Sequence, residues 1–429
     1  MSAASATVTL AVLLAALAGA PLFAVIGASA LAGFWLAGID GQAAIIEIYR
    51  LADTPVLVAI PLFTLAGYVL GESRAPQRLV RLTDALLGWL SGGLAIVALA
   101  ACALFTAFTG ASGITIVALG ALLYPALKTA GYGDRFSLGL VTSSGSLGIL
   151  FAPSVPLILY GVVAQQLDLP VRVGIDELFL AGLLPGLLML VILSAYSMWQ
   201  GRSLARARTA FDRREALAAL RDAAWELPLP ALVLGGIYGG VIALSEAAAL
   251  AAVYVLVVEV AIRREIALTD LPRVLVQAMQ LVGAILIILG VSLASTNILI
   301  DARVPSRLFE AIQGIIDNRW TFLIALNVFL LVLGMMLDIF SALVIMVPIL
   351  LPIAIGYGID PLHLGIIFLA NMQIGYFTPP VGMNLFIASF RFDKPVMTLY
   401  RATLPFFALL LFAVLIITYV PALSLWLPR

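Results

Sequence analysis

Charged residues are scarce in this chain of 429 residues: Asp, Glu, Lys and Arg together make up 11%, whereas hydrophobic residues make up 63%. An ordinary soluble domain has about 25% charged residues. A soluble fold of this length has too little interior to bury so much apolar surface, so lipid is the expected solvent for most of the chain. The apolar stretches are long and continuous rather than short and alternating, which excludes a membrane-spanning barrel. The sequence therefore predicts an all-α polytopic membrane protein.

Cysteine and histidine are almost absent, with Cys102 and His363 as the single examples. One cysteine cannot form an internal disulfide, and one histidine does not provide a Cys/His metal cluster. The 23 basic residues balance 23 acidic ones, so no charge excess points to a nucleic acid. We therefore expect no cofactor, no zinc site and no nucleic-acid partner.

Basic residues are also missing from the start of the chain, where no Lys or Arg precedes Arg50. A cleaved signal peptide begins with a positively charged segment, which this sequence lacks. The apolar stretch at about residues 8–36 is therefore expected to be a retained membrane span.

The longest polar stretch covers residues 200–226 and divides the chain into two hydrophobic halves, 1–199 and 227–429. Its charged residues are Arg202, Arg206, Arg208, Arg213, Arg214 and Arg221 against Asp212, Glu215, Asp222 and Glu226. The arginine excess predicts a cytoplasmic linker by the positive-inside rule. A merely solvated loop is the alternative, because long loops escape that rule.

The two halves resemble each other when one is shifted by 226 positions along the other. The matched pairs are Asp134 with Asp360, Gly139 with Gly365, Phe151 with Phe377 and Pro153 with Pro379. Such matches can arise by chance in an apolar background, but these include rare Asp and Pro residues. Because transporters are often built from two repeats of inverted topology, we expect two inverted repeats here.

One segment in each half fails as an ordinary span, at about residues 90–128 and 320–357. A single helix of nearly forty residues would measure about 57 Å at 1.5 Å per residue, against a hydrocarbon core of about 30 Å. Small and hydroxyl residues occupy the middle of the first segment at 106–113, and Gly334, Asp338 and Ser341 lie near the middle of the second. Each segment is predicted to be a re-entrant helical hairpin whose tip lies near the membrane midplane.

A second kind of irregular segment follows each hairpin, at about residues 137–166 and 362–391. Pro153 and Pro156 interrupt the first, and Pro379 and Pro380 interrupt the second, because proline lacks the backbone N–H that a helix needs. Irregular backbone at membrane depth is tolerated only where protein or a water-filled cavity satisfies it. A hairpin tip that faces a broken helix, present twice, is typical of a transporter binding site.

These elements offer groups for both an anion and a cation. The N-termini of half-helices suit an anionic substrate such as a carboxylate. Unwound carbonyls and half-helix C-termini suit sodium, together with the side-chain oxygens of Ser112, Asp338, Ser341 and Thr378. A carboxylate at membrane depth costs about 2.5–3.5 kcal/mol, so Asp338 needs a cation, a proton or another partner. It either binds a cation or caps a helix, and the two roles are compatible.

Three further features, Glu246, His363 and the glycines of residues 235–240, are expected to have structural rather than functional roles. Glu246 is expected to be a satisfied deep acid, with a role in gating as the alternative. His363 follows Asp360 and Pro361 at a helix entry, where a proton relay is disfavoured. The glycines of residues 235–240 lack the Lys-Ser or Lys-Thr of a phosphate loop and indicate close helix packing.

With these residues in view, the chain resembles the large membrane subunit of tripartite ATP-independent periplasmic (TRAP) transporters, the DctM type. The resemblance covers nearly the whole chain. Its most specific stretches are residues 60–63 (IPLF), 66–67 (AG), 92–95 (GGLA), 110–113 (GASG), 152–156 (APSVP), 178–182 (LFLAG), 185–186 (PG) and 378–382 (TPPVG). The family usually has two prolines before the serine of the first break, whereas this chain has Ala152 and Pro153.

The resemblance implies an elevator-type secondary importer in the bacterial inner membrane, driven by sodium, with a scaffold and a transport domain. It also implies two partners, a small four-helix membrane subunit and a periplasmic substrate-binding protein. No four-helix extension precedes the first half, so the small subunit is expected to be a separate chain. The implied substrates are small organic acids such as dicarboxylates, keto acids and sialic acids.

The resemblance further implies three sets of site residues. The first sodium site would involve Ser112 with backbone at Gly148 and Phe151. The second would involve Asp338, Ser341, Gly375 and Thr378. Substrate would lie between them, near Ser154, Thr115 and Asn384.

Two other functions are weighed against a binding-protein-dependent importer. A stand-alone sodium/dicarboxylate symporter or an ion exchanger would use similar hairpins. An intramembrane enzyme or an assembly scaffold is disfavoured, because one Cys, one His and scattered acids offer no convincing catalytic constellation. We therefore expect a protein that is not an enzyme.

Overall fold

The chain is all-helical over the residues that the computed structural model describes, which are 10–12, 14–42, 45–46, 49, 54–90, 92–167, 173–202 and 211–428. The prediction of an all-α protein is confirmed over these residues. The helices of the first half are α2 (Leu22–Leu36), η1 (Pro55–Val58), α4 (Ala59–Glu72), α5 (Ala75–Leu87), α6 (Gly93–Thr109), α7 (Ser112–Thr129), α8 (Asp134–Ser144), η2 (Leu147–Leu150), α9 (Val155–Gln165) and α10 (Ile175–Gly201). Within the predicted linker lies α11 (Arg213–Asp222), while residues 203–210, with Arg206 and Arg208, fall outside the described part.

The helices of the second half follow α11 along the chain. They are α12 (Pro228–Tyr238), α13 (Leu244–Leu256), η3 (Val257–Ile262), α14 (Leu271–Asp301), α15 (Val304–Gln313), α16 (Arg319–Met336), α17 (Ile339–Gly356), α18 (Pro361–Gly375), α19 (Met383–Phe392), α20 (Val396–Tyr419) and α21 (Ala422–Leu425). Among the described residues, 8 helices are long and apolar enough to cross a membrane, or up to 9 if the pair Asp134–Leu150 and Val155–Gln165, bent by 42°, is one span. The chain is therefore a polytopic helical protein.

The described part of the N-terminal apolar stretch is not one continuous helix. Helical residues up to 17 are followed by a turn at 18–21, in which Gly19 has a φ of +85°, and α2 begins directly after Pro21. α2 packs on α14, where Ala30 and Phe34 meet Ala294. Residues 1–9 and 13 of the expected span lie outside the described residues.

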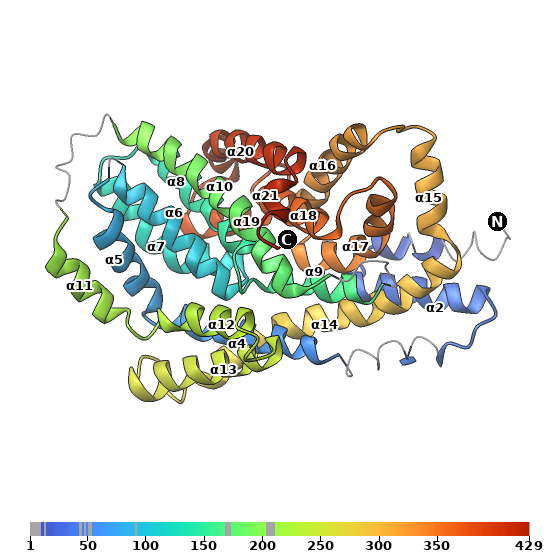
Figure 1. Cartoon of the computed structure of the whole chain (residues 1–429), viewed down its shortest axis with the longest axis horizontal. Helices are drawn as coiled ribbons and strands as arrows, with labels where there is room; N and C mark the ends of the chain where they lie inside the picture. Colours follow the sequence, from blue (N-terminus) through green and yellow to red (C-terminus); the bar gives the residue numbers. More distant parts are fainter. Residues whose placement is uncertain are drawn as a thin grey trace.

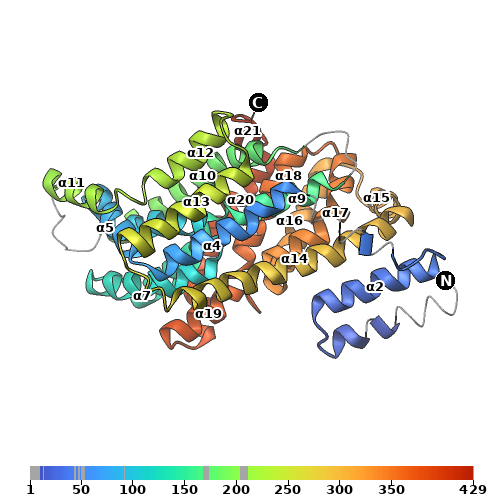
Figure 2. The same cartoon turned by 90° about the horizontal axis from the view of Figure 1, so that it is seen from below.

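The molecule has two distinct ends (Figure 1, Figure 2). α5 and α11 pack together at one end, which we call the linker side, and α15 lies at the other end, the opposite side. α6 follows α5 and so begins on the linker side, whereas α16 follows α15 and begins on the opposite side. The two hairpins, formed by α6 with α7 and by α16 with α17, therefore start from different ends of the molecule.

The helices also form two packed groups. α4 lies against α13 and α14. In the other group α8 packs on α20, α9 on α17, and α16 on α18, so that helices of the first half interleave with helices of the second. α5 connects the first group to the hairpin of α6 and α7, and α15 connects α14 to the hairpin of α16 and α17.

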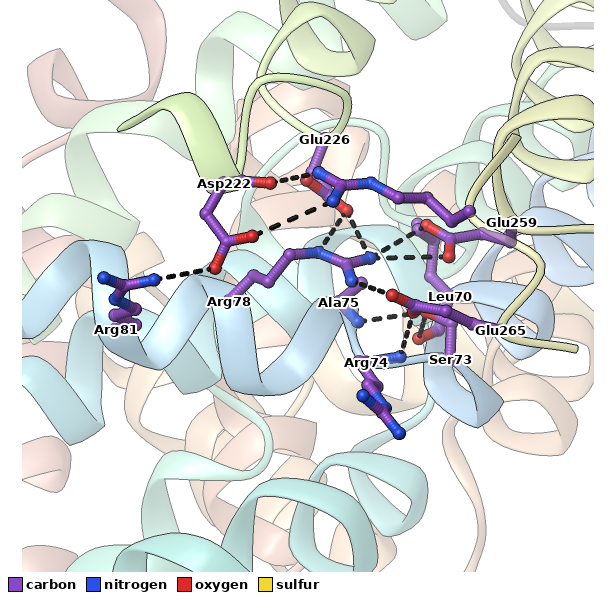
Figure 3. A network of polar contacts seen from close by, with 11 residues as sticks. Leu70, Ser73, Arg74, Ala75, Arg78, Arg81, Asp222, Glu226, Glu259 and Glu265 are labelled. Atoms are coloured by element: carbon purple, nitrogen blue, oxygen red, sulfur yellow. Dashed lines mark hydrogen bonds and ion pairs between the residues drawn. The ribbon is translucent and has the colours of Figure 1, made fainter. Parts of the chain in front are cut away.

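A buried arginine fixes α5 to elements far away in the sequence (Figure 3). The Arg78 guanidinium is 6% exposed, donates from Nε to Glu226 Oε1 at 2.7 Å, and lies 3.3 Å from Glu259 Oε1. It also pairs with Glu265, which in turn accepts the Arg74 N–H at 2.7 Å. The network joins α5 to the start of α12, to the π-helix η3 and to the loop that follows it.

The protonation of this network follows from its geometry. Burial alone would raise the pKa of Glu265, but hydrogen bonds from Arg78 and from the Arg74 N–H outweigh it and hold the pKa below its ordinary value. Burial would likewise lower the pKa of Arg78, but Glu265 and Glu226 outweigh it and raise the pKa. Both groups are therefore charged at neutral pH, and each depends on the other for its burial.

The Arg78→Ala variant is expected to lose about 3–5 kcal/mol of stability, because removing the cation leaves buried carboxylates without a counter-charge. The measurement is the melting temperature of the purified protein in detergent. Arg81→Ala is the matched control: Arg81 lies on the same helix and pairs with Glu215 and Asp222, but its side chain is 46% exposed. A solvated pair contributes little, so this control should melt close to the parent protein. Equal melting temperatures for the two variants would contradict the role given to Arg78.

Candidate functional site

The first hairpin turns over at residues 110–111. Gly110 has a φ of +64°, which favours glycine, and its N–H closes α6 by donating to Thr106 O at 2.8 Å. A Cβ added at Gly110 would lie 3.1 Å from Val155 Cβ, so the tip touches the start of α9. Ser112 opens α7 and is 3% exposed.

The second hairpin turns over at residues 337–338, and Asp338 caps α17. Asp338 Oδ1 accepts the N–H groups of Phe340 and Ser341 at 3.0 Å each, and Oδ2 accepts the Ser341 hydroxyl at 2.5 Å. The capping role considered for Asp338 is therefore present, and two oxygens with further lone pairs leave it able to accept more. The backbone N–H of Ile339 donates to the Tyr376 hydroxyl at 2.8 Å, which ties this tip to the segment after α18.

The first break, residues 145–154, separates α8 from α9 and contains the short helix η2. Pro153 follows a cis peptide bond, and Pro156 lies in the first turn of α9. A Cβ at Gly148 would lie 2.3 Å from Ala103 O, so this break packs tightly on α6. The Phe151 ring packs in the same way on Gly186, where an added Cβ would be 2.8 Å away.

The second break, residues 376–382, separates α18 from α19 and contains the cis bond between Pro379 and Pro380. The Thr378 hydroxyl donates to Ile374 O at 2.8 Å, and the Gly382 N–H donates to Met335 O at 3.1 Å. A Cβ at Gly375 would lie 2.5 Å from the backbone of Gly334. This glycine pair lets the end of α18 approach α16 directly below its tip.

Three hydrogen bonds join the two halves at these irregular segments. The Ser112 hydroxyl donates to Asn384 Oδ1 at 2.8 Å, and Asn384 Nδ2 donates to Thr142 O at 3.4 Å. The Ser146 hydroxyl donates to Gln373 O at 3.1 Å. Residues more than 220 positions apart thus meet within one polar region.

The predicted substrate residues lie behind the first tip. Thr115, Ser154 and Asn384 are each 0% exposed. The Thr115 and Thr106 hydroxyls lie 2.7 Å apart, and Thr106 donates to Gly145 O at 2.9 Å. Ser154 Oγ is buried without a hydrogen-bond partner among the described residues. The Oγ1 atoms of Thr109 and Thr142 are also buried without a hydrogen-bond partner among the described residues. Three such oxygens therefore lie in the segments that form the first tip and the first break.

A cavity of about 860 Å³ reaches both tips and continues to the linker side. Of the predicted site residues it brings together Ser112, Asp338 and Ser341. Its described lining does not include Gly148, Phe151, Gly375, Thr378, Thr115, Ser154 or Asn384. The helices α4 and α14 form its other face, and at the linker side it ends at Glu72 and Gln77.

Several residues that line the cavity were not predicted from the sequence, including Tyr376, Gln277, Glu72 and Arg391. Tyr376 lies within the irregular segment predicted at about residues 362–391 and could have been found there. Arg391 stands out as a charged residue at the end of an apolar stretch. Gln277 and Glu72 carry no such signal, because only packing of α14 and α4 against the tips makes them lining residues.

Glu246 and His363, for which the sequence favoured structural roles, both have hydrogen-bond partners. Glu246 lies at the start of α13, where its exposed side chain accepts the Ala243 N–H at 2.8 Å, so the acid has the hydrogen-bond partner that its structural interpretation expects. His363 is fully buried and lies within hydrogen-bond distance of the Ser424 hydroxyl and Thr418 O, at 3.1 and 3.2 Å.

Comparison with known proteins places this chain in a family. A family model described as "Tripartite ATP-independent periplasmic transporter, DctM component" matches residues 7–423. The chain is 36% identical to the isethionate TRAP transporter permease protein DctMQ of Oleidesulfovibrio alaskensis over 95% of its own length, and spans 64% of that relative. It is also 36% identical to the C4-dicarboxylate TRAP transporter large permease protein DctM of Pseudomonas aeruginosa, covering 90% of this chain and 88% of that one.

A solved structure shares the fold at low sequence identity. The YdaH transporter of Alcanivorax borkumensis superposes with a TM-score of 0.60 and 15% identity, covering 88% of each chain. This likeness concerns the architecture, and the resemblance to the DctM type noted from the motifs is confirmed by the family model and the two relatives.

The Gly375→Ala variant is expected to lose about 1–3 kcal/mol of stability, because its Cβ would press on the Gly334 backbone, which cannot rotate away. Gly283→Ala on α14 is the matched control, since nothing lies within 4 Å of a Cβ there. That control should melt at or slightly above the parent temperature, because alanine favours a helix. A Gly375→Ala protein as stable as the control would show that α16 and α18 do not need this close approach.

Proposed function

The chain belongs to the DctM family of tripartite ATP-independent periplasmic transporters, and on this premise we propose that it imports a small organic acid by coupling to sodium. Substrate arrives from a periplasmic binding protein, and a small four-helix membrane subunit completes the assembly. The observation that carries the proposal is the convergence of the two hairpin tips and of Tyr376 from the second break on one cavity, with the first break packed against α6 behind the first tip. The proposed activity is transport and involves no catalytic residue.

The first tip and first break supply the first sodium site in this proposal. Sodium is a hard ion that takes oxygen ligands, and Ser112 with the carbonyls at Gly148 and Phe151 would provide them. The unpartnered buried oxygens of Thr109 and Thr142 support a cation in this region, because a buried hydroxyl without a partner costs free energy that a bound ion would recover.

The second tip and second break supply the second sodium site, with Asp338, Ser341, Gly375 and Thr378. Asp338 is the single acid at either tip, and its capping bonds hold the carboxylate in a fixed orientation. A preorganised carboxylate loses little entropy when it binds a cation. Capping and cation binding therefore support each other at this residue.

The substrate carboxylate would lie between the tips. The N-termini of α7 and α17 both end there and carry partial positive charge. The cavity reaches these tips at Ser112 and Ser341, while Ser154, Thr115 and Asn384 form the layer behind the first tip. In the proposal this layer holds the tip in shape for the solute.

The charge distribution supports a cytoplasmic linker side. Basic residues described on that side include Arg74, Arg78, Arg81, Lys128, Arg135, Arg202, Arg213, Arg214, Arg221, Arg263, Arg264, Arg273 and Lys394. The opposite side carries Arg303, Arg307 and Arg319. By the positive-inside rule the linker side faces the cytoplasm of the bacterial inner membrane, so this conformation opens inward.

The proposed motion is an elevator movement of the hairpins and breaks along a scaffold. The group around α4, α13 and α14 would stay fixed, because Arg78 holds α5 to it. The group from α6 to α9 and from α16 to α20 would carry the solute. The opposite starting ends of the two hairpins support inverted repeats.

The first test is uptake into proteoliposomes. The solute captured by the cognate binding protein should enter only when this chain, the small membrane subunit, the binding protein and external sodium are all present. Each omission should reduce uptake to the level of empty liposomes. Uptake by this chain alone would instead favour a stand-alone symporter or exchanger.

The second test concerns Asp338. Asp338→Asn should lower the apparent sodium affinity at least about tenfold, because a neutral amide replaces the charged ligand. Asp360→Asn is the matched control, since Asp360 also caps a helix, by accepting the Leu362 N–H at 2.9 Å, but does not line the cavity. Unchanged sodium activation in Asp338→Asn, in a protein as stable as the control, would remove Asp338 from the proposed site.

A further inference from the structure

Three charged residues line the cavity among the described residues: Asp338 at the second tip, and Glu72 and Arg391 further along. The two acids already have partners. Glu72 Oε2 accepts from Arg273 Nη2 at 2.9 Å, and Asp338 accepts the bonds that cap α17. Arg391 is therefore the one described cation that faces this space.

One part of the Arg391 guanidinium, Nε, is hydrogen-bonded to the protein, and the Nη1 and Nη2 atoms are available to a ligand. Its Nε donates to Val117 O at 3.1 Å, which fixes the guanidinium to α7. No acidic partner for its Nη1 and Nη2 atoms occurs among the described residues. Those two atoms form the end of the guanidinium that matches a carboxylate in a two-point contact.

The position of Arg391 separates it from the tips. Val117 lies five residues beyond Ser112 along α7, which corresponds to about 7.5 Å at 1.5 Å per residue. Gln77 and Gln277 line the same cavity and add amide groups that hydrogen-bond anions. The cavity thus has an acid at its tip end and an arginine between the tips and the linker side.

We propose that Arg391 determines charge selectivity, by binding the anionic group of the solute within the cavity after the solute leaves the tips. The inference rests on the proposed function, since it takes the solute to be an organic anion. A cation in a partly enclosed cavity raises the local concentration of anions and lowers that of cations. The two-point contact then adds preference for carboxylate-like groups over halides.

A simpler interpretation is an arginine that extends to the membrane surface and only binds lipid headgroups or water. Two observations favour the cavity instead. The guanidinium is bonded to the backbone of α7, and Arg391 shares the cavity lining with residues of α4 and α14. The test below distinguishes the two interpretations without knowledge of the solute.

The experiment measures the electrostatic potential of the cavity with two thiol reagents of opposite charge. Cys102 is buried and is replaced by alanine, and Ala121→Cys provides a reporter, because Ala121 lines the cavity one helical turn beyond Val117. The purified chain is treated at low ionic strength with anionic sulfonatoethyl methanethiosulfonate and with cationic trimethylammonioethyl methanethiosulfonate. The ratio of the two rates is the readout.

R391Q should lower the anionic-to-cationic rate ratio at least about tenfold, because one nearby charge changes the two rates in opposite directions. R391K should keep most of the ratio, since the charge remains. R135Q is the matched control: Arg135 lies on α8 at the same side but outside the cavity lining, so the ratio should stay near the parent value. Melting temperatures verify that all variants are folded.

Two results would overturn the proposal: a ratio that R391Q leaves unchanged, or a ratio that R135Q lowers as much as R391Q does. The readout needs neither sodium nor the partner proteins. Failure of sodium-driven uptake in the reconstituted assembly would therefore disprove the proposed function while leaving this result intact. A normal uptake assay with an unchanged ratio would disprove the role of Arg391 alone.

Discussion

The need to satisfy backbone polar groups within the membrane determines the centre of this protein. Lipid offers no hydrogen bonds, so every helix interruption at membrane depth needs protein or water as a partner. Here the interruptions satisfy one another. The second tip and the second break exchange bonds through Met335 O and the Tyr376 hydroxyl, and Ser146 of the first break donates to Gln373 O. A polar region between the halves is the direct consequence.

This mutual arrangement requires close approach of backbones, which the sequence achieves with glycine. Gly375 meets Gly334, and Gly148 meets α6, at distances that leave no room for a Cβ. The charged network of Arg78 has the complementary effect at the linker side, where it fixes α5 to η3 and the start of α12. The packing at the centre and the attachment at one end enclose a cavity between the two tips and the helices α4 and α14, which is where the proposed function places the solute.

The sequence was informative where rare residues interrupt long apolar stretches. The helix interruptions at residues 110–111 and 337–338 lie within the small and polar patches noted there, and Pro153 and Pro379 lie within the breaks. What could not be predicted depends on packing between distant segments. Arg78 and Glu226 are 148 positions apart, and nothing local indicates that they pair. The burial of Thr115 and Ser154 behind the tip has the same cause.

The cavity charges suggest how sodium and an organic anion would depend on each other in the proposed function. Asp338 lies at the tip end, where the solute carboxylate is placed, and two like charges about 6 Å apart at an effective dielectric constant of about 20 repel by roughly 3 kcal/mol. In that proposal a sodium ion on Asp338 would remove the repulsion, and by the reciprocity of binding free energies the solute would retain sodium to the same extent. Because the ion and the solute are stabilised by each other at one tip, neither would be carried efficiently alone. In the proposed function, coupling would then follow from charge balance at Asp338 and would need no separate structural change that depends on whether the ion is bound.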